Sequence, residues 1–473
     1  MTLREVLGAA ARDVPPVDVT ALAYDNRLVT PGTLFFCVPG FTRDGHDFAA
    51  DAIARGASAL VVQRPLDLGV PEVRVDDVRA AMAPAAARLH GDPTAALRAV
   101  GITGTNGKTT TAYLVRGLLE AAGRRTGLVG TVSAVVGGAE RPMVRTTPEA
   151  IDLQRMFAEM RDGGDEAVVM EVSSHALALH RADAIHWDVA IFTNLTQDHL
   201  DFHPTMEDYF IAKRRLFDSG PEVAVINVDD PYGARLAAGL PDAIRVGIDA
   251  PGAQLRATAI ASDATGSTFT ADGLTLRSPL PGRFNVLNVL GAVAAVRALG
   301  VDDATIAAAL PHAARVPGRF EPVDEGQPFA VLVDYAHTPD SLENVLRAAR
   351  PLTTGRVITV FGAGGDRDRA KRPLMGAVVR ELSDVAIVTS DNPRSEDPEA
   401  IIAAVLEGAG PQAEAEVDRR AAIQRAIGMA APGDIVLIAG KGHEQGQELA
   451  GGRTVPFDDV TVAREALRAR LVA

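Results

Sequence analysis

The chain contains 473 residues, of which 47% are hydrophobic and 23% are charged, and its formal net charge at pH 7 is −14. This length is typical of about three domains, and the composition is ordinary for a folded, soluble protein. The negative charge disfavours nonspecific nucleic-acid binding, because that binding depends on lysine and arginine displacing counterions from the phosphate backbone. We therefore expect no nucleic-acid partner.

No segment has the pattern of a membrane span or a secretory signal. Residues 1–13 include charged side chains among small apolar ones, unlike the uninterrupted apolar stretch of a signal peptide. The apolar stretch 291–310 is interrupted by Arg297 and Asp302 before it reaches the ~20 residues that a span requires. We expect a cytoplasmic monomer that does not enter a membrane.

The first section of the chain, residues 1–97, alternates short apolar runs at 34–38 and 59–62 with helix-like segments. It ends after the loop-forming sequence Gly91-Asp92-Pro93, which predicts a domain boundary near residue 97. The single cysteine of the chain, Cys37, cannot form an internal disulfide. We expect it to be a small buried apolar residue.

Two further sections, residues 98–314 and 315–473, alternate strand-like runs with amphipathic helices. The predicted strands are 99–103, 167–172, 188–193 and 222–228 in the first of these sections, and 330–333, 356–361, 385–389 and 434–439 in the second. Alternation of this kind predicts mainly parallel sheets with helices on both faces. The predicted fold class is therefore α/β, with an N-terminal domain at 1–97, a central domain at 98–314 and a C-terminal domain at 315–473.

Polar residues follow each predicted strand of the last section. The four runs are Asp334-Tyr335-Ala336-His337, Gly362-Ala363-Gly364-Gly365-Asp366-Arg367, Ser390-Asp391-Asn392-Pro393-Arg394 and Gly440-Lys441-Gly442-His443-Glu444. Ligands of open α/β sheets bind at the carboxyl ends of the strands. We therefore predict that these runs converge on the edge of one pocket.

A glycine-rich loop joins the predicted strand 99–103 to a predicted helix. Its residues are Gly104, Thr105, Asn106, Gly107, Lys108, Thr109 and Thr110. Such a turn directs backbone N–H groups and a helix N-terminus at one point, which suits the phosphates of ATP. Lys108 would neutralise the β and γ phosphates, and Thr109 would bind Mg²⁺. The Walker pattern has a glycine where this chain has Ile102, so the loop is a shorter variant; the alternative is a glycine-rich turn with a surface lysine.

The loop resembles that of the Mur ligase family, and further matching motifs extend across nearly the whole chain. They are Arg145-Thr146-Thr147-Pro148, Glu171-Val172-Ser173-Ser174-His175, Asn194-Leu195-Thr196-Gln197-Asp198-His199-Leu200-Asp201, Tyr209-Phe210-Ile211-Ala212-Lys213, Gly282-Arg283-Phe284-Asn285, Pro317-Gly318-Arg319-Phe320-Glu321 and Asp334-Tyr335-Ala336-His337-Thr338-Pro339. The resemblance implies a UDP-binding N-terminal domain, a central P-loop ATPase domain and a Rossmann-like C-terminal domain that binds the amino acid.

The Glu-Val-Ser-Ser-His, Asp-Asn-Pro-Arg and Gly-Lys-Gly-His-Glu motifs resemble the branch of this family that adds diaminopimelate during peptidoglycan precursor synthesis. The resemblance implies a ligase that forms a carbon–nitrogen bond. ATP would phosphorylate the γ-carboxylate of D-glutamate in UDP-N-acetylmuramoyl-L-alanyl-D-glutamate, and the amine of meso-diaminopimelate would attack the resulting acyl phosphate. This chemistry depends on cations placed around the transferred phosphoryl group.

The resemblance implies four catalytic residues, Lys108, Glu171, His199 and Lys213. It makes Glu171, His199 and Lys213 metal ligands with Thr109. Lys213 would carry a carbamate formed with CO₂, which replaces a cation with an anionic oxygen ligand. The residues alone leave open a buried, capped glutamate, a structural histidine and a surface helix lysine at these positions.

Other residues match the family's substrate positions. Those implied for the nucleotide substrate are Tyr24, Asn26, Phe41, Thr42, Arg43, Thr146, Thr147, Ser173, Leu179 and Arg181. The resemblance adds Asn285, Arg319 and Asp334 for ATP, with hydrogen bonding in a hinge region as the alternative. Two positions depart from the pattern, because related enzymes often have serine at Asn26 and some have glutamine at Leu179.

The amino-acid site implied by the resemblance consists of Arg367, Asp391, Asn392, Pro393, Arg394, Gly440 and Glu444. A guanidinium binds a carboxylate through two parallel hydrogen bonds, so Arg394 would recognise the distal carboxylate that distinguishes diaminopimelate from lysine. Glu444 would suit the distal ammonium. The alternative is that Arg394 is a solvated loop residue paired with Glu396 or Asp397.

Several other functions remain open at this point. Within the ligases they are a lysine-adding enzyme, which the Asp-Asn-Pro-Arg motif argues against, and a folylpolyglutamate synthetase, which the N-terminal UDP-type domain argues against. From another class, a P-loop phosphotransferase would phosphorylate a small molecule without ligation. A noncatalytic relative is disfavoured because Lys108, Glu171, His199 and Lys213 are all present.

Overall fold

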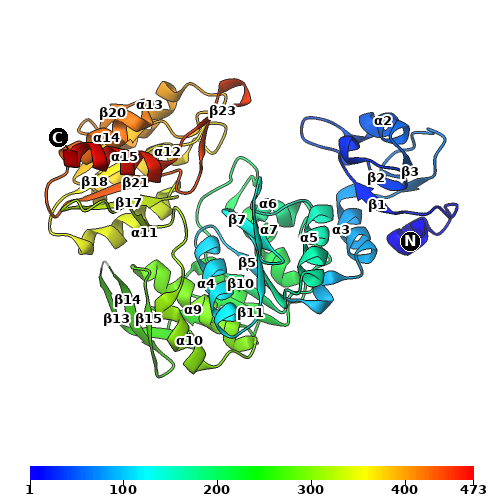
Figure 1. Ribbon diagram of the computed structural model, residues 1–473, viewed down its shortest axis with the longest axis horizontal. Coiled ribbons are helices and arrows are strands. Elements are labelled where there is room, and N and C mark those ends of the chain that lie inside the picture. Colours follow the sequence, from blue (N-terminus) through cyan, green and yellow to red (C-terminus); the bar gives the residue numbers. More distant parts are fainter. Residues whose placement is uncertain (264, 473) are drawn as a thin grey trace. The chain divides into compact units, whose positions relative to one another are not determined.

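The structure is a computed structural model that describes residues 1–263 and 265–472 (Figure 1). The chain divides into two compact units. Unit 1 comprises Met1–Thr103, Leu119–Ile191 and Ala212–Ala224, and unit 2 comprises Gly104–Leu118, Phe192–Ile211 and Val225–Ala473. Within the described residues, no helix has both the length and the apolar character needed to cross a membrane.

The N-terminal part of unit 1 is built on a parallel sheet with the strand order β1-β2-β3-β4. Its elements are α1 (Leu3–Leu7), β1 (Ala21–Ala23), β2 (Thr33–Phe36), α2 (Ala49–Ala54), β3 (Ala57–Val62), β4 (Glu72–Arg74) and α3 (Val78–Leu89). Side chains alternate along β2, so that Phe36 packs with α1 and α3 whereas Phe35 packs with α2. Cys37 is fully buried beside Phe35, as expected.

A long sheet follows, with the strand order β15-β14-β13-β12-β11-β10-β5-β9-β6-β7-β8. Its strands are β5 (Arg98–Thr103), β6 (Thr126–Val129), β7 (Ser133–Val136), β8 (Ala139–Pro142), β9 (Ala167–Glu171), β10 (Val189–Phe192), β11 (Val223–Asn227), β12 (Ile244–Gly247), β13 (Leu255–Asp263), β14 (Gly266–Ala271) and β15 (Leu274–Ser278). The pairs β5–β9, β6–β9 and β11–β12 are parallel, and the strands at both edges are antiparallel.

Most helices of this region directly follow a strand of the long sheet, and several carry predicted site residues. They are α4 (Lys108–Ala121), α5 (Ala150–Asp162), α6 (Ser174–Ala178), α7 (Met206–Asp218), α8 (Pro231–Ala238), α9 (Arg283–Ala298) and α10 (Asp303–Ala309). Helix α9 has buried apolar residues on every side, including Leu290, Ala295 and Val296. It is therefore a core helix rather than an amphipathic surface helix.

The C-terminal part of unit 2 contains a second, mainly parallel sheet with the order β16-β17-β21-β18-β19-β20. Its strands are β16 (Glu321–Pro322), β17 (Ala330–Asp334), β18 (Val357–Phe361), β19 (Val385–Thr389), β20 (Glu414–Glu416) and β21 (Ile435–Ala439). Helices α11 (Pro339–Ala349), α12 (Lys371–Leu382) and α13 (Pro398–Ala409) pack on one face, and α14 (Arg419–Met429) and α15 (Asp459–Val472) pack on the other. A hairpin of β22 (Gly446–Leu449) and β23 (Arg453–Pro456) precedes α15.

The predicted α/β class with parallel sheets is confirmed. Each of the eight predicted strands of the second and third sections is present, and each differs from the prediction by no more than one residue at either end. The domain boundaries near residues 97 and 314 stay predictions.

Candidate active site

Two glycines of the loop before α4 pack so closely that no larger residue would fit. Gly104 and Gly107 have φ angles of +153° and +85°, which favour glycine. A Cβ atom on Gly104 would lie 1.8 Å from Thr193 Oγ1, and one on Gly107 would lie 2.3 Å from Asn288 Oδ1. The loop is therefore fixed by close packing, as the phosphate-binding prediction requires.

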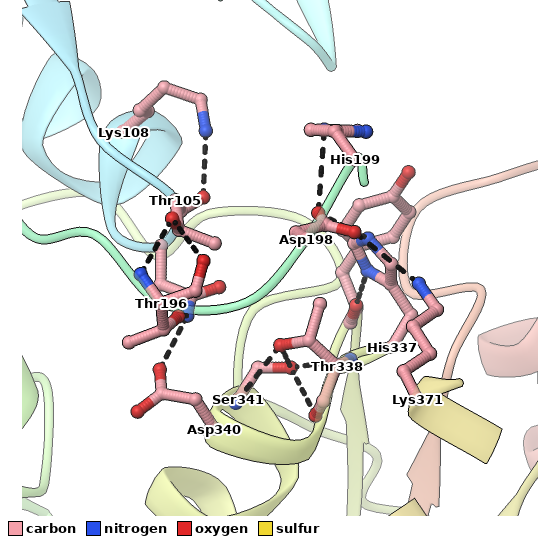
Figure 2. Close-up of polar contacts among 12 residues, drawn as sticks. Thr105, Lys108, Thr196, Asp198, His199, His337, Thr338, Asp340, Ser341 and Lys371 are labelled. Carbon is pink, nitrogen blue, oxygen red and sulfur yellow. Dashed lines mark hydrogen bonds and ion pairs between the residues drawn. The ribbon is translucent and has the colours of Figure 1, made fainter. Parts of the chain in front are cut away.

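Asn106 fixes the loop to neighbouring segments of unit 2. Its backbone N–H donates to Asn194 Oδ1 over 2.9 Å, and its side-chain Nδ2 donates to Asp340 Oδ2 over 2.6 Å. Burial raises the pKa of Asp340, which lies in the first turn of α11. Lys108 Nζ donates to the carbonyl oxygens of Gly104 and Thr105 over 2.9 and 2.8 Å, and Figure 2 shows the ammonium directed back over the loop.

Of the three further residues predicted to bind ATP, Arg319 contacts the loop directly, and Asn285 contacts it through Asn288. Asp334 bonds to backbone groups elsewhere. Arg319 Nη2 donates to Thr109 Oγ1 over 3.2 Å, and its guanidinium carbon lies 4.4 Å from the centre of the Tyr335 ring. Asn285 is buried and accepts a bond from Asn288, the residue packed against Gly107. Asp334 instead accepts the backbone N–H groups of Phe320 and Ala336, and burial raises its pKa. Asp334 therefore shapes the backbone next to Arg319.

Asp198 is a buried carboxylate surrounded by basic side chains of unit 2 (Figure 2). Its oxygens lie 3.4 Å from His199 Nε2, 3.8 Å from His337 Nε2 and 3.4 Å from Lys371 Nζ. Burial alone would raise the pKa of Asp198, but the three neighbouring bases outweigh burial and hold that pKa below its ordinary value. This cluster joins the loop after β10 to the start of α11 and to α12.

In unit 1, Glu171 at the carboxyl end of β9 is buried and hydrogen-bonded. Its Oε1 accepts from the backbone N–H of Thr131 over 2.8 Å, and its Oε2 accepts from Thr131 Oγ1 over 3.0 Å. Thr131 Oγ1 also lies 3.1 Å from Thr146 Oγ1. Thr147 donates to the backbone oxygen of Glu171 and accepts the backbone N–H of Ser173. Thr147 therefore contacts the predicted metal ligand directly, whereas Thr146 and Ser173 are linked to it through Thr131 and Thr147.

Lys213 lies in α7 with an exposed fraction of only 1%. The alternative of a surface helix lysine is therefore wrong. Burying an unmodified ammonium costs free energy, because the charged group loses its hydration. The burial agrees with a modified, anionic form of Lys213 and also with an ammonium that meets acidic partners.

Arg181 belongs to a group of three arginines that converge on the buried carboxylate of Glu149. Arg181 Nη2 and Arg145 Nη1 each lie 2.8 Å from Glu149 Oε1, and Arg79 Nη1 lies 3.3 Å from Glu149 Oε2. Burial and then the two other arginines lower the pKa of Arg181, although Glu149 opposes them. One carboxylate balances only one of the three positive charges, so the group attracts an anion.

The other residues predicted for the nucleotide substrate are spread over unit 1. The Tyr24 hydroxyl donates to Asp152 Oδ2 over 2.7 Å, and Asn26 Nδ2 donates to Asp51 Oδ2 over 2.6 Å. The segment Phe41-Thr42-Arg43 is exposed, and Phe41 has an exposed fraction of 80%. Leu179 ends α6 and is half-buried.

The predicted amino-acid residues of unit 2 gather at the carboxyl ends of β18, β19 and β21. Asn392 Nδ2 donates to Glu444 Oε2 over 2.8 Å. A Cβ atom on Gly440, which has a φ of +121°, would lie 2.5 Å from Asp391 Oδ2. The loop after β19 and the loop after β21 are therefore in contact, as the convergence of these runs predicted.

Arg394 is held at the rim of this region in an uncommon backbone conformation. Its φ is +53°, its Nε donates to Glu448 Oε2 over 2.7 Å and its Nη1 donates to Gly365 O over 2.8 Å. Glu396 instead pairs with Arg372, so the alternative pairing of Arg394 with Glu396 is wrong. Arg367 is exposed, and its Nη1 donates to the backbone oxygen of Asp366.

No group of three or more histidine, cysteine, aspartate and glutamate side chains is arranged to hold a metal ion within residues 1–263 and 265–472. The predicted set of metal ligands combines Glu171 and His199 with a threonine and a modified lysine. This set stays a prediction. Thr109 and His199 lie in unit 2, whereas Glu171 and Lys213 lie in unit 1.

Several residues that contact a predicted site residue, or contact a direct neighbour of one, had no role predicted from the sequence. They are Arg79, Thr131, Glu149, Asp198, Asn288, His337, Lys371 and Lys441. Asp198, His337 and Lys441 lie inside motifs that resemble those of the family, so their proximity to the site could have been anticipated. Asn288 follows Asn285 by three residues on α9, a spacing that places both on one face of a helix. Thr131 and Arg79 gave no local signal.

Three family descriptions match consecutive parts of the chain. Residues 18–90 match the Mur ligase family catalytic domain, residues 102–296 the Mur ligase middle domain, and residues 318–442 the Mur ligase glutamate ligase domain.

Relatives of similar length match almost the entire chain. The chain is 48% identical to the UDP-N-acetylmuramoyl-L-alanyl-D-glutamate--2,6-diaminopimelate ligase of Streptomyces coelicolor, over 98% of this chain and 96% of that protein. It is 50% identical to the protein of the same name from Geobacillus thermodenitrificans, over 96% of each.

A solved structure of a UDP-N-acetylmuramoyl-L-alanyl-D-glutamate--2,6-diaminopimelate ligase has a TM-score of 0.71 at 32% identity, and the alignment covers 100% of this chain and 99% of that one. The similarity therefore includes the order of all three regions and their folds. With its glycine-rich loop and its three consecutive matching domains, the chain belongs to the Mur ligase family.

Proposed function

We propose that this protein ligates meso-diaminopimelate to the γ-carboxylate of D-glutamate in UDP-N-acetylmuramoyl-L-alanyl-D-glutamate, with ATP as the energy source. The observation that carries the proposal is the 48–50% identity to ligases of that name over at least 96% of both chains. The reaction belongs to cytoplasmic peptidoglycan precursor synthesis. The partners are these two substrates, and the protein acts as a monomer without nucleic acid or membrane.

The reaction converts a carboxylate, which is unreactive towards amines, into an acyl phosphate. The loop 104–110 holds the phosphates of ATP through its backbone N–H groups and the N-terminus of α4. When ATP binds, the ammonium of Lys108 leaves the carbonyl oxygens of Gly104 and Thr105 and donates to phosphate oxygens instead. Arg319 lies 3.2 Å from Thr109 and adds a second cation for the charge that develops during phosphoryl transfer. The amine then attacks the acyl carbon, and phosphate leaves.

Magnesium fits the chemistry of the predicted ligands. Thr109 supplies a hydroxyl oxygen, Glu171 a carboxylate and carbamylated Lys213 a second anionic oxygen donor, and oxygen donors are the ligands that Mg²⁺ prefers. His199 is proposed as a ligand of a second metal. When bound, the metal neutralises phosphate charge. The full burial of Lys213 supports the carbamate, because carbamylation removes a buried positive charge.

The arginine group around Glu149 supports an anionic nucleotide substrate. Arg181 is held by Glu149 and by the backbone oxygen of Thr147, and Thr147 is in turn bonded to Glu171. Positive charge and the predicted metal ligand are therefore connected through one chain of hydrogen bonds. This arrangement suits a substrate that has a diphosphate at one end and a reacting carboxylate at the other.

The amino-acid end of the site favours diaminopimelate over lysine. Arg394 is fixed by two hydrogen bonds, and its planar guanidinium suits a carboxylate. A hydrogen bond to a charged group contributes about 1.5–3 kcal/mol, so a lost pair could change specificity by ~10²–10⁴. Asp391, Asn392, Pro393, Gly440 and Arg367 shape the same region, and Glu444 receives the distal ammonium.

The test is an ADP-release assay with the nucleotide dipeptide and a panel of diaminopimelate, lysine and ornithine. The proposal requires ADP release that depends on both the nucleotide substrate and diaminopimelate. Equal or faster release with lysine would favour a lysine-adding enzyme. Release without any amino acid, together with a stable phosphorylated product, would favour a phosphotransferase.

A further inference from the structure

Lysine is rare in this chain, and all four lysines lie near predicted site residues. The chain has 47 lysine and arginine residues, and all of them are arginine except Lys108, Lys213, Lys371 and Lys441. The last three are buried, with exposed fractions of 1%, 4% and 0%. The two side chains differ in size and geometry: an ammonium is a compact point charge, whereas a guanidinium is a planar fork. Lys371 pairs with Asp198, which leaves Lys441 to be explained.

The Lys441 ammonium contacts two residues of the predicted amino-acid site. Its Nζ donates to Asn392 Oδ1 over 2.8 Å and lies 3.0 Å from Glu444 Oε2. Asn392 Nδ2 donates to the same Glu444 oxygen over 2.8 Å. The three side chains therefore form a closed triangle of hydrogen bonds.

The triangle fixes the orientation of both polar groups that would meet the amino acid. Asn392 Oδ1 also accepts the backbone N–H of Glu448 over 3.0 Å, so the amide has one orientation only. The other Glu444 oxygen, Oε1, lies 3.4 Å from the Tyr335 hydroxyl. Glu444 has a side-chain exposed fraction of 30%, whereas Lys441 has none. The Glu444 side chain is therefore partly open to solvent, whereas the lysine that contacts it is buried.

Further buried charges lie near the Lys441 ammonium. Asp391 is buried, and although burial would raise its pKa, Lys441 and then Arg419 hold that pKa below its ordinary value. Arg419 is paired through two bonds to the fully buried Asp459 and donates to Ala439 O, directly before Gly440. Lys441 and Arg419 therefore share one network with the carboxylates of Asp391, Asp459 and Glu444, and Lys441 has little freedom to move.

Arginine should not reproduce the contacts of Lys441, because its guanidinium is a planar fork and not a compact ammonium. The Asn392 oxygen and the Glu444 oxygen converge on a single nitrogen, which suits the point charge of an ammonium better than a fork. A lysine at this position agrees with this geometry.

We propose that Lys441 is a positioning residue for the incoming diamino acid: its ammonium holds the Glu444 carboxylate and the Asn392 amide in the arrangement that binds the distal ammonium. This proposal rests on the proposed function, since it concerns the same amino-acid site. Lys441 does not touch the substrate itself. Its removal should weaken amino-acid binding and leave ATP binding unchanged.

The experiment measures KM for diaminopimelate, ATP and the nucleotide dipeptide in the wild type, Lys441→Met and Lys441→Arg. We expect both variants to raise KM for diaminopimelate by about tenfold to a hundredfold with the other two KM values unchanged. Arg420→Lys, at an exposed position at the start of α14, is the matched control and should behave as wild type. An unchanged KM for diaminopimelate in Lys441→Met, or full rescue by arginine, would overturn the proposal.

A double-mutant cycle with Glu444→Gln separates a positioning role from general loss of structure. If Lys441 acts through Glu444, Lys441→Met should add little to the KM for diaminopimelate once Glu444 is already glutamine. The double variant also leaves no unpaired Glu444 carboxylate, so it provides the comparison if Lys441→Met alone does not fold. A further large rise in KM in the double variant would contradict the proposal. A wild type that ligates no diaminopimelate would instead refute the proposed function.

Discussion

Arg319 Nη2 donates a hydrogen bond to Thr109 Oγ1 over 3.2 Å, which joins the start of the C-terminal region to the phosphate loop within unit 2. The same guanidinium lies over the Tyr335 ring, 4.4 Å from its centre. A lysine cannot make both contacts, because it lacks the planar fork. We expect Arg319→Lys and Arg319→Met to raise KM for ATP by about tenfold or more. Steady-state kinetics measure this effect, with the exposed Arg347→Lys as the control; an ATP KM equal to that of the control would refute the role of Arg319.

Lys213 should be essential because of its modification and not because of its positive charge. Arginine keeps the charge but cannot form the carbamate, so Lys213→Arg should abolish ligation while circular dichroism remains that of the wild type. In the wild type, ¹³C-labelled bicarbonate should give a carbamate resonance that is absent from the variant. Normal turnover by Lys213→Arg would remove this role. Its neighbour Arg214, which is exposed and pairs with Asp218, provides the control variant Arg214→Lys.

Arg394 should determine the preference for diaminopimelate. We expect Arg394→Ala to raise KM for diaminopimelate by about a hundredfold and to leave kcat/KM for lysine nearly unchanged, because lysine has no distal carboxylate. The ratio of the two kcat/KM values would therefore fall. Competition between the two amino acids, followed by mass spectrometry of the products, measures that ratio directly. A ratio equal to that of the wild type would show that another residue recognises the carboxylate.

Breaking the Arg419–Asp459 pair should destabilise the C-terminal region. Both side chains are fully buried, so removing one partner leaves an unpaired buried charge. We expect Asp459→Asn to lower the free energy of unfolding by about 3–5 kcal/mol. The adjacent pair Arg420–Glu465 is exposed on both sides, and Glu465→Gln should change the free energy by less than about 1 kcal/mol. Denaturant unfolding of the two variants tests the contrast, and equal effects would contradict it.

Cys37 should be unreactive while the protein is folded. Burial raises the pKa of its thiol to about 12, so the reactive thiolate is only about 10⁻⁴ of the population at pH 8. Iodoacetamide should therefore modify Cys37 only when the N-terminal sheet opens, and modification in denaturant should be complete. Mass spectrometry after timed exposure measures both rates. Rapid modification in the native buffer would show that the sheet opens readily.

The elements that depend on local sequence were predictable. Gly104 and Gly107 stand where a strand meets a helix, and the structure gives both the positive φ angles that such a turn requires. The parallel strands were located to within one residue, because continuous apolar runs of that length are typical of buried parallel strands. Fold class and the phosphate loop thus followed from patterns within short segments.

Contacts between distant segments were not predictable in the same way. The burial of Lys213 could not be read from a helix that also contains Arg214 and Arg215. The partner of Arg394 is Glu448, 54 residues away, and not the nearby acidic residues that the sequence suggested. Such pairs depend on how the loops after different strands meet, which the order of residues within one loop does not specify.

An ¹⁸O label can test whether D-glutamate is joined to diaminopimelate through an acyl phosphate. The γ-carboxylate of the D-glutamate residue is labelled with ¹⁸O, and the released phosphate is analysed by mass spectrometry. Ligation by this route transfers one ¹⁸O atom to each phosphate and forms one amide-linked diaminopimelate per ADP. Phosphate without the label, or ADP formed without the tripeptide product, would show that the chain does not work in this way.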